Sequence, residues 1–276
     1  MEHQISELTQ FVNHYLGPMA LALLNLLHIK PSHPELPIPE STVMSLLILV
    51  ICTLLALFLR PRLSVERPGA TQQIAEILLT NPMGFGIRDL LIENVGHGAE
   101  RYIPFVGSVA VFILFSNLLG LVPHLAAPTG ALVVPLGCAI LTFLYFNMHG
   151  ARHHGVVGYL GTFAGSPKHF WDFVLAVLLF PVEIISTTAR ILSLTVRLYA
   201  NMFASDLIYT IFLSLLAGGF TFGWSKSPVL GAILAVFPAT IPVAFLGLHI
   251  FVSVVQAYVF TVLPAVYLGL ATSEEH

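Results

Sequence analysis

Two apolar stretches in the second half of the chain are too long to cross a bilayer upright. The first extends from Trp171 to about Leu216, with no strong helix breaker after Pro181, and the second from Val229 to Leu270. As one α-helix the first would measure about 65 Å, whereas the hydrocarbon core of a bilayer is about 30 Å thick. We therefore expect two strongly tilted or broken helices that form a hairpin nearly in the membrane plane.

The segment between these stretches predicts where the hairpin turns. It holds residues that favour the end of a helix: Gly218, Gly219, Gly223, Ser225 and Pro228. We therefore expect a loop from about Ala217 to Pro228, without an assigned role.

Three shorter apolar runs predict upright membrane spans. They extend from Thr42 to Leu59, from Tyr102 to Val122 and from Ala131 to Asn147. Runs of this kind match the thickness of a bilayer core, and 57% of all residues are hydrophobic, with a mean hydropathy of +0.89. The sequence therefore predicts an all-α polytopic membrane protein with three upright spans and two long tilted helices.

Residues 72–101 are too charged to span the membrane. Short apolar runs there alternate with Glu76, Arg88, Asp89 and Glu93. This mixture is typical of helices that lie at the membrane surface. We predict an amphipathic helical hairpin at the cytoplasmic interface.

The charges of the loops predict the orientation of the chain. Arg60, Arg62 and Arg67 follow the first span, and Arg152 and Lys168 follow the third. Basic loops remain in the cytoplasm by the positive-inside rule. Two independent loops therefore agree, and they predict a cytoplasmic C-terminus and a non-cytoplasmic N-terminus.

The first forty residues differ from the remainder. They carry four glutamates and one lysine, which suits the non-cytoplasmic side, and they contain a helix candidate around Leu16 to Ile29 before a proline-rich stretch. We therefore predict two parts: a non-cytoplasmic segment, residues 1–40, and a membrane domain, residues 41–276.

The first long apolar stretch holds four charged residues where charge is scarce. Only 9% of the chain is charged, yet Glu183, Arg190, Arg197 and Asp206 lie within this stretch. A charged side chain at the centre of a membrane helix costs about 2.5–3.5 kcal/mol on insertion scales, which makes each one a functional candidate. The structural alternative is that the arginines extend to the lipid headgroups or pair within a bundle.

Helical spacing sorts these residues into two faces. At about 100° per residue, Glu183, Arg190 and Asn201 fall within about 40° of Arg197, whereas Asp206 points to the opposite side. The helix is therefore predicted to present a cationic face and a carboxylate face.

The second long stretch carries its own polar residues. His249, Ser253 and Gln256 share one face by their spacing. A hairpin would bring His249 opposite the helix that supplies Asp206, and histidine can accept and donate a proton near neutral pH. We therefore predict a proton-relay pair, with a purely structural histidine as the alternative.

Other classes of site are poorly supported. Cys52 and Cys138 both lie in apolar runs, where a small hydrophobic role is more typical than a disulfide or a metal ligand. The histidines follow no metal-binding spacing, and no GxxxxGK[ST] nucleotide motif is present. We expect no metal, no cofactor and no nucleic acid.

The residues around Arg197 resemble a known family. SLTVRLYANMFASDLI at 193–208 is similar to the SLxLRLFGNMxAGELI motif of subunit a of the rotary ATP synthases. LHIFVSVVQAYVFTVLPAVYL at 248–268, NLLGLVP at 117–123 and PVE at 181–183 extend the resemblance over roughly residues 40–276. The first forty residues match poorly.

The resemblance implies a role for Arg197 and its neighbours. Arg197 would face the carboxylates of the rotor ring of c subunits, with Asn201 one turn away. Asp206 takes the position of a family glutamate, and His249 and Gln256 those of polar residues on the second helix. Because arginine stays charged in proteins, it can hold a rotor carboxylate without passing a proton.

The same resemblance implies a path for protons through two offset half-channels. A proton from outside would pass Asn117, Asp206 and His249 to a rotor carboxylate, and would leave to the cytoplasm near Glu183. The full set of candidates on the path is Asp206, His249, Gln256, Asn117, Glu183, Arg190 and Ser253. The implied partners are the c-subunit ring, the b subunits of the peripheral stalk and membrane lipid, with H⁺ as the transported ion in a bacterial inner plasma membrane.

Some features keep alternatives open. Ala200 and Ser205 stand where the family usually has glycine, and Asp206 is one methylene shorter than glutamate. A secondary transporter with charges at mid-membrane depth is the main alternative, although such proteins usually contain internal repeats, and we detect none. A passive structural anchor is a further alternative.

Overall fold

The structure is a computed structural model that describes residues 6–28, 36–64, 68–70, 72–73, 76, 86–96, 98–122, 125–155, 158–159, 161 and 170–272. Every secondary-structure element in these ranges is a helix. Five of the described helices are long and apolar enough to cross a membrane. The predicted class, an all-α polytopic membrane protein, is therefore confirmed.

Three helices coincide with the predicted shorter spans. They are α2 (Glu40–Leu59), α5 (Ile103–Leu119) and α6 (Val133–His154). A helix satisfies all its backbone hydrogen bonds within one segment, which hydrocarbon requires. The apolar runs in the sequence are therefore sufficient to predict that these three segments are helices.

The two long stretches form longer helices than the sequence predicts. Helix α8 (Phe170–Trp224) has 55 residues and α9 (Pro228–Thr272) has 45. The predicted loop from Ala217 to Pro228 is wrong, because α8 continues to Trp224 and only residues 225–227 connect the two helices.

The glycines therefore do not end α8. Each glycine in a helix costs about 1 kcal/mol, but an unpaired backbone group in an apolar environment costs several. The helix ends where backbone turns close it: Ser225 N–H donates to Thr221 C=O at 3.2 Å, and Lys226 N–H donates to Gly223 C=O at 3.0 Å. Pro228 then begins α9, where its missing N–H is harmless.

The predicted hairpin at 72–101 is described only in part. It contains α4 (Ile87–Val95) and the short helix η2 (Ala99–Tyr102). An ion pair of 3.1 Å between Arg88 and Glu100 connects the two helices. Residues 77–85 lie outside the described part, so the hairpin as a whole remains a prediction.

The first helix begins earlier than predicted. Helix α1 (Glu7–Leu26) starts at the N-cap Ser6, whose hydroxyl accepts a hydrogen bond from Thr9 N–H. The prediction of a helix from Leu16 to Ile29 followed apolar residues alone and missed this polar first turn, which the cap stabilises by about 1 kcal/mol.

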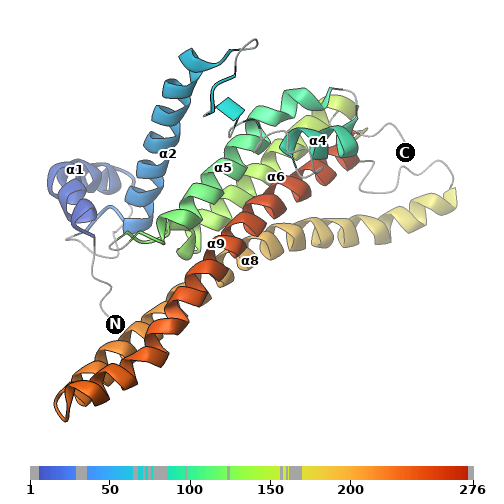
Figure 1. The fold of residues 1–276 in the computed structure, drawn as a ribbon. Helices are drawn as coiled ribbons and strands as arrows, with labels where there is room; N and C mark the ends of the chain where they lie inside the picture. Colours follow the sequence, from blue (N-terminus) through green and yellow to red (C-terminus); the bar gives the residue numbers. More distant parts are fainter. Residues whose placement is uncertain are drawn as a thin grey trace. The chain divides into compact units, whose positions relative to one another are not determined.

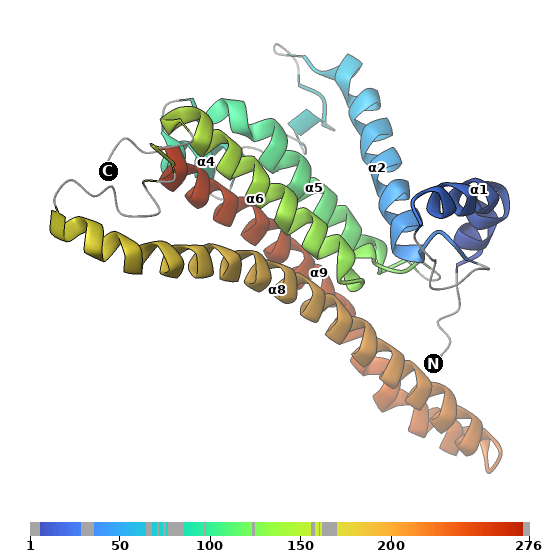
Figure 2. The same cartoon turned by 180° about the vertical axis from the view of Figure 1, so that it is seen from behind.

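The chain divides into two compact units. Unit 1 comprises Met1–Ile51, Ile113–Val134 and Leu198–Val255, and unit 2 comprises Cys52–Phe112, Pro135–Arg197 and Gln256–His276. Within unit 1, the end of α8 and the beginning of α9 lie side by side, as Figures 1 and 2 both show, with the rings of Phe212 and Phe245 stacked at 6.2 Å.

Unit 2 has a core where α4 meets the helices around it. Its buried residues include Leu91, Tyr102, Val106, Phe146 and Leu268. Gly269 allows α9 to approach α4 closely, because a Cβ at this position would collide with the backbone carbonyl of Asn94. Both cysteines, Cys52 and Cys138, are free thiols.

Candidate functional site

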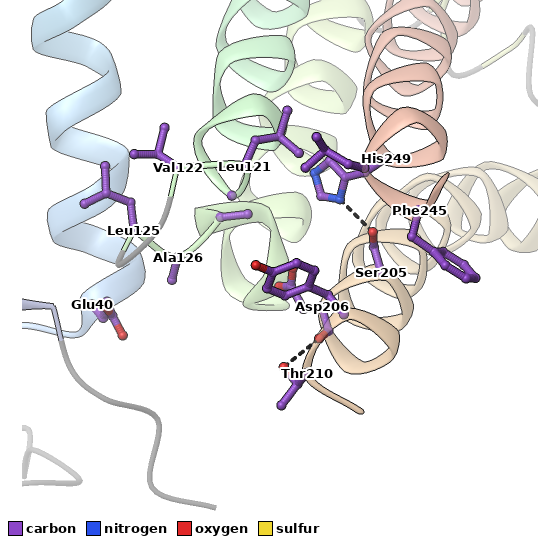
Figure 3. A pocket seen from close by; sticks show the side chains of 14 residues that line it. Glu40, Leu121, Val122, Leu125, Ala126, Ser205, Asp206, Thr210, Phe245 and His249 are labelled. Atoms are coloured by element: carbon purple, nitrogen blue, oxygen red, sulfur yellow. Dashed lines mark hydrogen bonds between the residues drawn. The ribbon is translucent and has the colours of Figure 1, made fainter. Parts of the chain in front are cut away.

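A polar pocket of about 240 Å³ opens in unit 1 between α8, α9 and the segment that follows α5 (Figure 3). Asp206, Ser205 and Tyr209 line it from α8, and Phe245 and His249 line it from α9. The remaining lining residues include Glu40, Gly120, Leu125 and Ala127. The predicted pair, Asp206 and His249, therefore shares one pocket.

Both ring nitrogens of His249 have hydrogen-bond partners. The side chain is 6% exposed; Nε2 lies 3.0 Å from the backbone carbonyl of Asn117, and Nδ1 lies 2.6 Å from Ser205 Oγ. A carbonyl can only accept, so Nε2 carries a hydrogen. In the neutral ring Nδ1 is then the acceptor, and the Ser205 hydroxyl donates to it; Figure 3 draws this hydrogen bond as a dashed line.

Asn117 is fully buried, and its backbone carbonyl and its side chain form hydrogen bonds with different residues. Its carbonyl binds His249, while its side-chain Oδ1 accepts a hydrogen bond of 2.7 Å from the hydroxyl of buried Thr129. Its amide nitrogen, Nδ2, has no hydrogen-bond partner among the described residues. An unpaired buried donor costs about 1–3 kcal/mol, and such groups often bind ordered water.

Asp206 is half-buried at the pocket wall. A Cβ added to Gly130 would lie 3.4 Å from its Oδ2, so the carboxylate rests against the glycine of the short helix η3 (Pro128–Gly130). One turn further along α8, the Thr210 hydroxyl donates to the backbone carbonyl of Asp206 at 2.8 Å. The carboxylate therefore lies close to the backbone of Gly130.

Ser253 is fully buried on α9 and forms a hydrogen bond with the backbone of the same helix. Its hydroxyl donates to the carbonyl of His249 at 2.7 Å. This local bond satisfies a hydroxyl that would otherwise be buried without a partner.

Unit 2 holds the other charged residues of α8. Arg190 forms an ion pair of 3.5 Å with Glu183, and its guanidinium lies 4.9 Å from the ring centre of Tyr267 on α9. Pairing within the bundle, which the sequence left open for Arg190, is therefore what the structure contains. A partly exposed pair of this kind is worth less than about 1 kcal/mol.

Tyr159 lies near this ion pair. Its hydroxyl donates to Asn147 Oδ1 at 2.9 Å. Burial raises the pKa of the phenol, the charge of Arg190 lowers it and that of Glu183 raises it, with a net upward shift. Tyr159 therefore stays protonated and acts as a hydrogen-bond donor.

Gln256 is buried in unit 2, on α9. It is 3% exposed, and its side-chain Oε1 has no hydrogen-bond partner among the described residues. The side chain therefore presents a free acceptor in an apolar setting.

Arg197 differs from Arg190 because its side chain is exposed. Its contact within the described chain is a hydrogen bond of 3.5 Å, the limit of a hydrogen bond, to the hydroxyl of Ser193 one turn earlier. No described carboxylate lies within ion-pair distance of it, and exposed small residues, Ala189 and Ser193, precede it on the same side of α8. Asn201 follows one turn later on the same helix and is half-buried.

Sequence reasoning missed several residues that build these sites. The sequence marks Ser205 only as a departure from the family's glycine, and it gives no signal for Thr129, Gly130 or Tyr267. The NLLGLVP motif at 117–123 was the nearest signal, since it marks the segment that reaches His249.

The helices and buried polar groups define a class of protein: a polytopic membrane protein with charged and hydrogen-bonding groups inside apolar helices, as ion-translocating subunits have. Comparison with known proteins makes this specific. The family described as ATP synthase A chain matches residues 42–269, and the chain belongs to this family. It is a proton-translocating membrane subunit of the bacterial plasma membrane, not an enzyme by itself.

Several curated relatives support the assignment. ATP synthase subunit a of Koribacter versatilis is 40% identical over 276 residues, which cover the whole of both chains. ATP synthase subunit a of Solibacter usitatus is 37% identical over 96% of this chain and 99% of its own length. That of Myxococcus xanthus is 35% identical over 88% of this chain and 75% of its own.

Proposed function

We propose that this chain is the stator proton channel of a rotary ATP synthase, in which two offset half-channels and Arg197 couple proton flow to rotation of a c-subunit ring. The observation that carries the proposal is the exposed guanidinium of Arg197 on an apolar helix, with no described carboxylate as its partner. A charge at membrane depth is costly unless an opposite charge compensates it. Acidic residues of a neighbouring subunit would supply that compensation.

Arginine and its small neighbours suit this task. A guanidinium holds a carboxylate by two charge-assisted hydrogen bonds and is not deprotonated in proteins. Small residues such as Ala189 and Ser193, exposed on the same side, let another helix approach closely. Arg197 would therefore bind each rotor carboxylate as it passes, without conducting protons itself.

The pocket in unit 1 forms the uptake half-channel in this proposal. Asp206 collects a proton at the pocket wall and exchanges it with His249. His249 takes the proton from Asp206 at Nδ1, on the side of Ser205, because Nε2–H faces a carbonyl that cannot take a proton. The same nitrogen then gives the proton to a rotor carboxylate. Asn117 then serves to orient the ring, and Ser253 holds the backbone beneath it.

The polar residues of unit 2 form the release half-channel. Glu183 receives the proton and passes it toward the cytoplasm, while Arg190, whose guanidinium lies against the ring of Tyr267, holds its carboxylate in position. Gln256 offers a buried acceptor that a water molecule in the channel can use.

The order of residues along α8 supports two separate half-channels. Glu183 precedes Arg197 by fourteen residues and Asp206 follows it by nine, about 21 Å and 13 Å of helix. A fixed positive charge between them opposes direct passage of a proton. Each elementary charge that crosses 100 mV releases about 2.3 kcal/mol, which the ring converts into rotation.

The remaining assignments follow the same proposal. The N-terminus lies outside the cytoplasm and the C-terminus within it, because Arg60 and Arg62 end the first span and Arg152 lies at the end of α6. Residues 1–40 form the non-cytoplasmic segment and residues 41–276 the membrane domain. The b subunits of the peripheral stalk hold the chain against the ring, and H⁺ is the transported ion.

The deciding experiment replaces Arg197 in the assembled complex in sealed vesicles. Arg197→Ala and Arg197→Lys should abolish proton-driven ATP synthesis, the latter because a desolvated ammonium can lose its proton. Arg190→Lys is the matched control, because Arg190 already has Glu183 as its partner. Coupled synthesis by an intact Arg197→Ala complex would refute the proposal.

A further inference from the structure

Helix α1 in unit 1 exposes apolar side chains on one face and polar side chains on another. The apolar face consists of Phe11, Tyr15, Met19, Leu23 and Leu26, which are 59–75% exposed. At about 100° per residue, the exposed polar residues Glu7, Gln10, His14 and Asn25 are centred about 120° around the helix from the apolar face. The exposed surface of the helix is therefore divided into an apolar part and a polar part.

A third face, between the other two, packs against the chain itself. Thr9, Asn13 and Gly17 are its buried residues. The Asn13 side chain donates to Ile38 C=O at 3.1 Å and accepts from Ile38 N–H at 3.0 Å, while a Cβ at Gly17 would already lie 3.5 Å from the ring of Pro37. A helix of a water-soluble protein packs its apolar face inward, so α1 has the reverse arrangement.

These contacts set the position of α1 relative to a membrane span. Ile38 lies two residues before the start of α2, and the Ser6 N–H donates to Glu40 Oε1 at 3.2 Å. Figures 1 and 2 both show α1 beside the start of α2. The part of α2 in unit 1 exposes apolar side chains such as Leu46, Leu49 and Val50. Because Glu40 is the first residue of this candidate membrane span, these contacts hold α1 at the end of the span.

We propose that α1 is an interfacial helix that binds the lipid bilayer where α2 enters it. Its apolar face lies at the boundary between headgroups and acyl chains, and its polar face lies in water, the arrangement typical of helices in the plane of the interface. Residues 6–28 contain no lysine or arginine, so burial of apolar surface drives binding and anionic lipid is not needed. The helix holds Glu40, which lines the polar pocket, against movement.

The exposed polar face favours lipid over a protein partner as the occupant of the apolar face. A helix at the bilayer surface needs one dry side and one wet side, and α1 has both along its length. Arg197 takes no part in the contacts of α1 and α2, so an interfacial α1 does not depend on the role proposed for Arg197.

The test measures the surroundings of single spin labels in the assembled complex, in phosphatidylcholine vesicles. Cys52 and Cys138 are first replaced by alanine, and a nitroxide is attached at Met19→Cys on the apolar face or at His14→Cys on the polar face. The Met19 label should collide more often with oxygen, which concentrates in lipid, than with a water-soluble nickel complex. The His14 label should show the reverse.

Two outcomes would overturn the inference. A Met19 label shielded from both reagents would mean that another protein covers the face, and one that meets mainly nickel would mean that the face lies in water. ATP-driven proton pumping equal to that of the cysteine-free parent verifies assembly. Leu23→Cys gives a second reading of the apolar face if Met19→Cys does not assemble.

Discussion

Ser205 and His249 lie on the two long helices and share a hydrogen bond of 2.6 Å between Oγ and Nδ1. The backbone carbonyl of Asn117 holds the other ring nitrogen. The histidine is thereby fixed in one orientation and, when neutral, in one tautomer. Its Nδ1, next to the pocket that Asp206 lines, is the atom at which proton exchange is expected.

Ser205→Ala should slow proton uptake without preventing assembly. The loss of one hydrogen bond corresponds to about 0.5–1.5 kcal/mol, which as a rate effect is about two- to tenfold. Ser205→Thr keeps the hydroxyl and is the matched control. ATP-driven acidification of inverted vesicles measures the effect, and equal rates for the alanine and threonine variants would show that the bond plays no part.

Asp206→Asn should reduce proton flux more strongly, because an amide cannot release a proton. Asp206→Glu keeps the acid and should retain part of the flux, because its carboxyl group is displaced by only one methylene. Passive proton conduction through the membrane sector after removal of the catalytic sector is the appropriate measurement. If the asparagine variant conducts as fast as the parent, Asp206 does not belong to the path.

The two arginines of α8 should respond very differently to loss of charge. Arg190→Gln removes a half-exposed ion pair with Glu183 and a contact with Tyr267, which is worth about 1 kcal/mol or less. We therefore expect coupled ATP synthesis to fall by less than about tenfold. Arg197→Gln should abolish synthesis, and equal defects in both variants would contradict the distinction between a paired and a rotor-facing arginine.

Gly269→Ala should destabilise unit 2. The added Cβ would collide with the backbone carbonyl of Asn94, so α4 and α9 must separate, at a cost of about 1–3 kcal/mol. Gly137→Ala is the control, because no atom lies within 4 Å of its added Cβ. Thermal unfolding in detergent should show a lower midpoint for the first variant and an unchanged or higher one for the second.

The amino-acid sequence is sufficient to predict the membrane-spanning helices and the charged residues within α8. Long apolar runs in lipid have to be helical, so α2, α5 and α6 follow from composition, and the high cost of charge in hydrocarbon singles out Arg197 and Asp206. These are local properties, which neighbouring residues in the chain are sufficient to reveal.

Which polar groups lie in contact depends on how the helices pack. Ser205 and Asn117 are 44 and 132 residues away from His249, and no periodicity in the sequence specifies the register that brings their polar atoms within 3 Å. The same holds for the contact of Arg190 with Tyr267 and for the end of α8 beyond Gly218 and Gly219. Hydrogen bonds depend on distances and angles between distant segments, and these are set by packing of the whole helix.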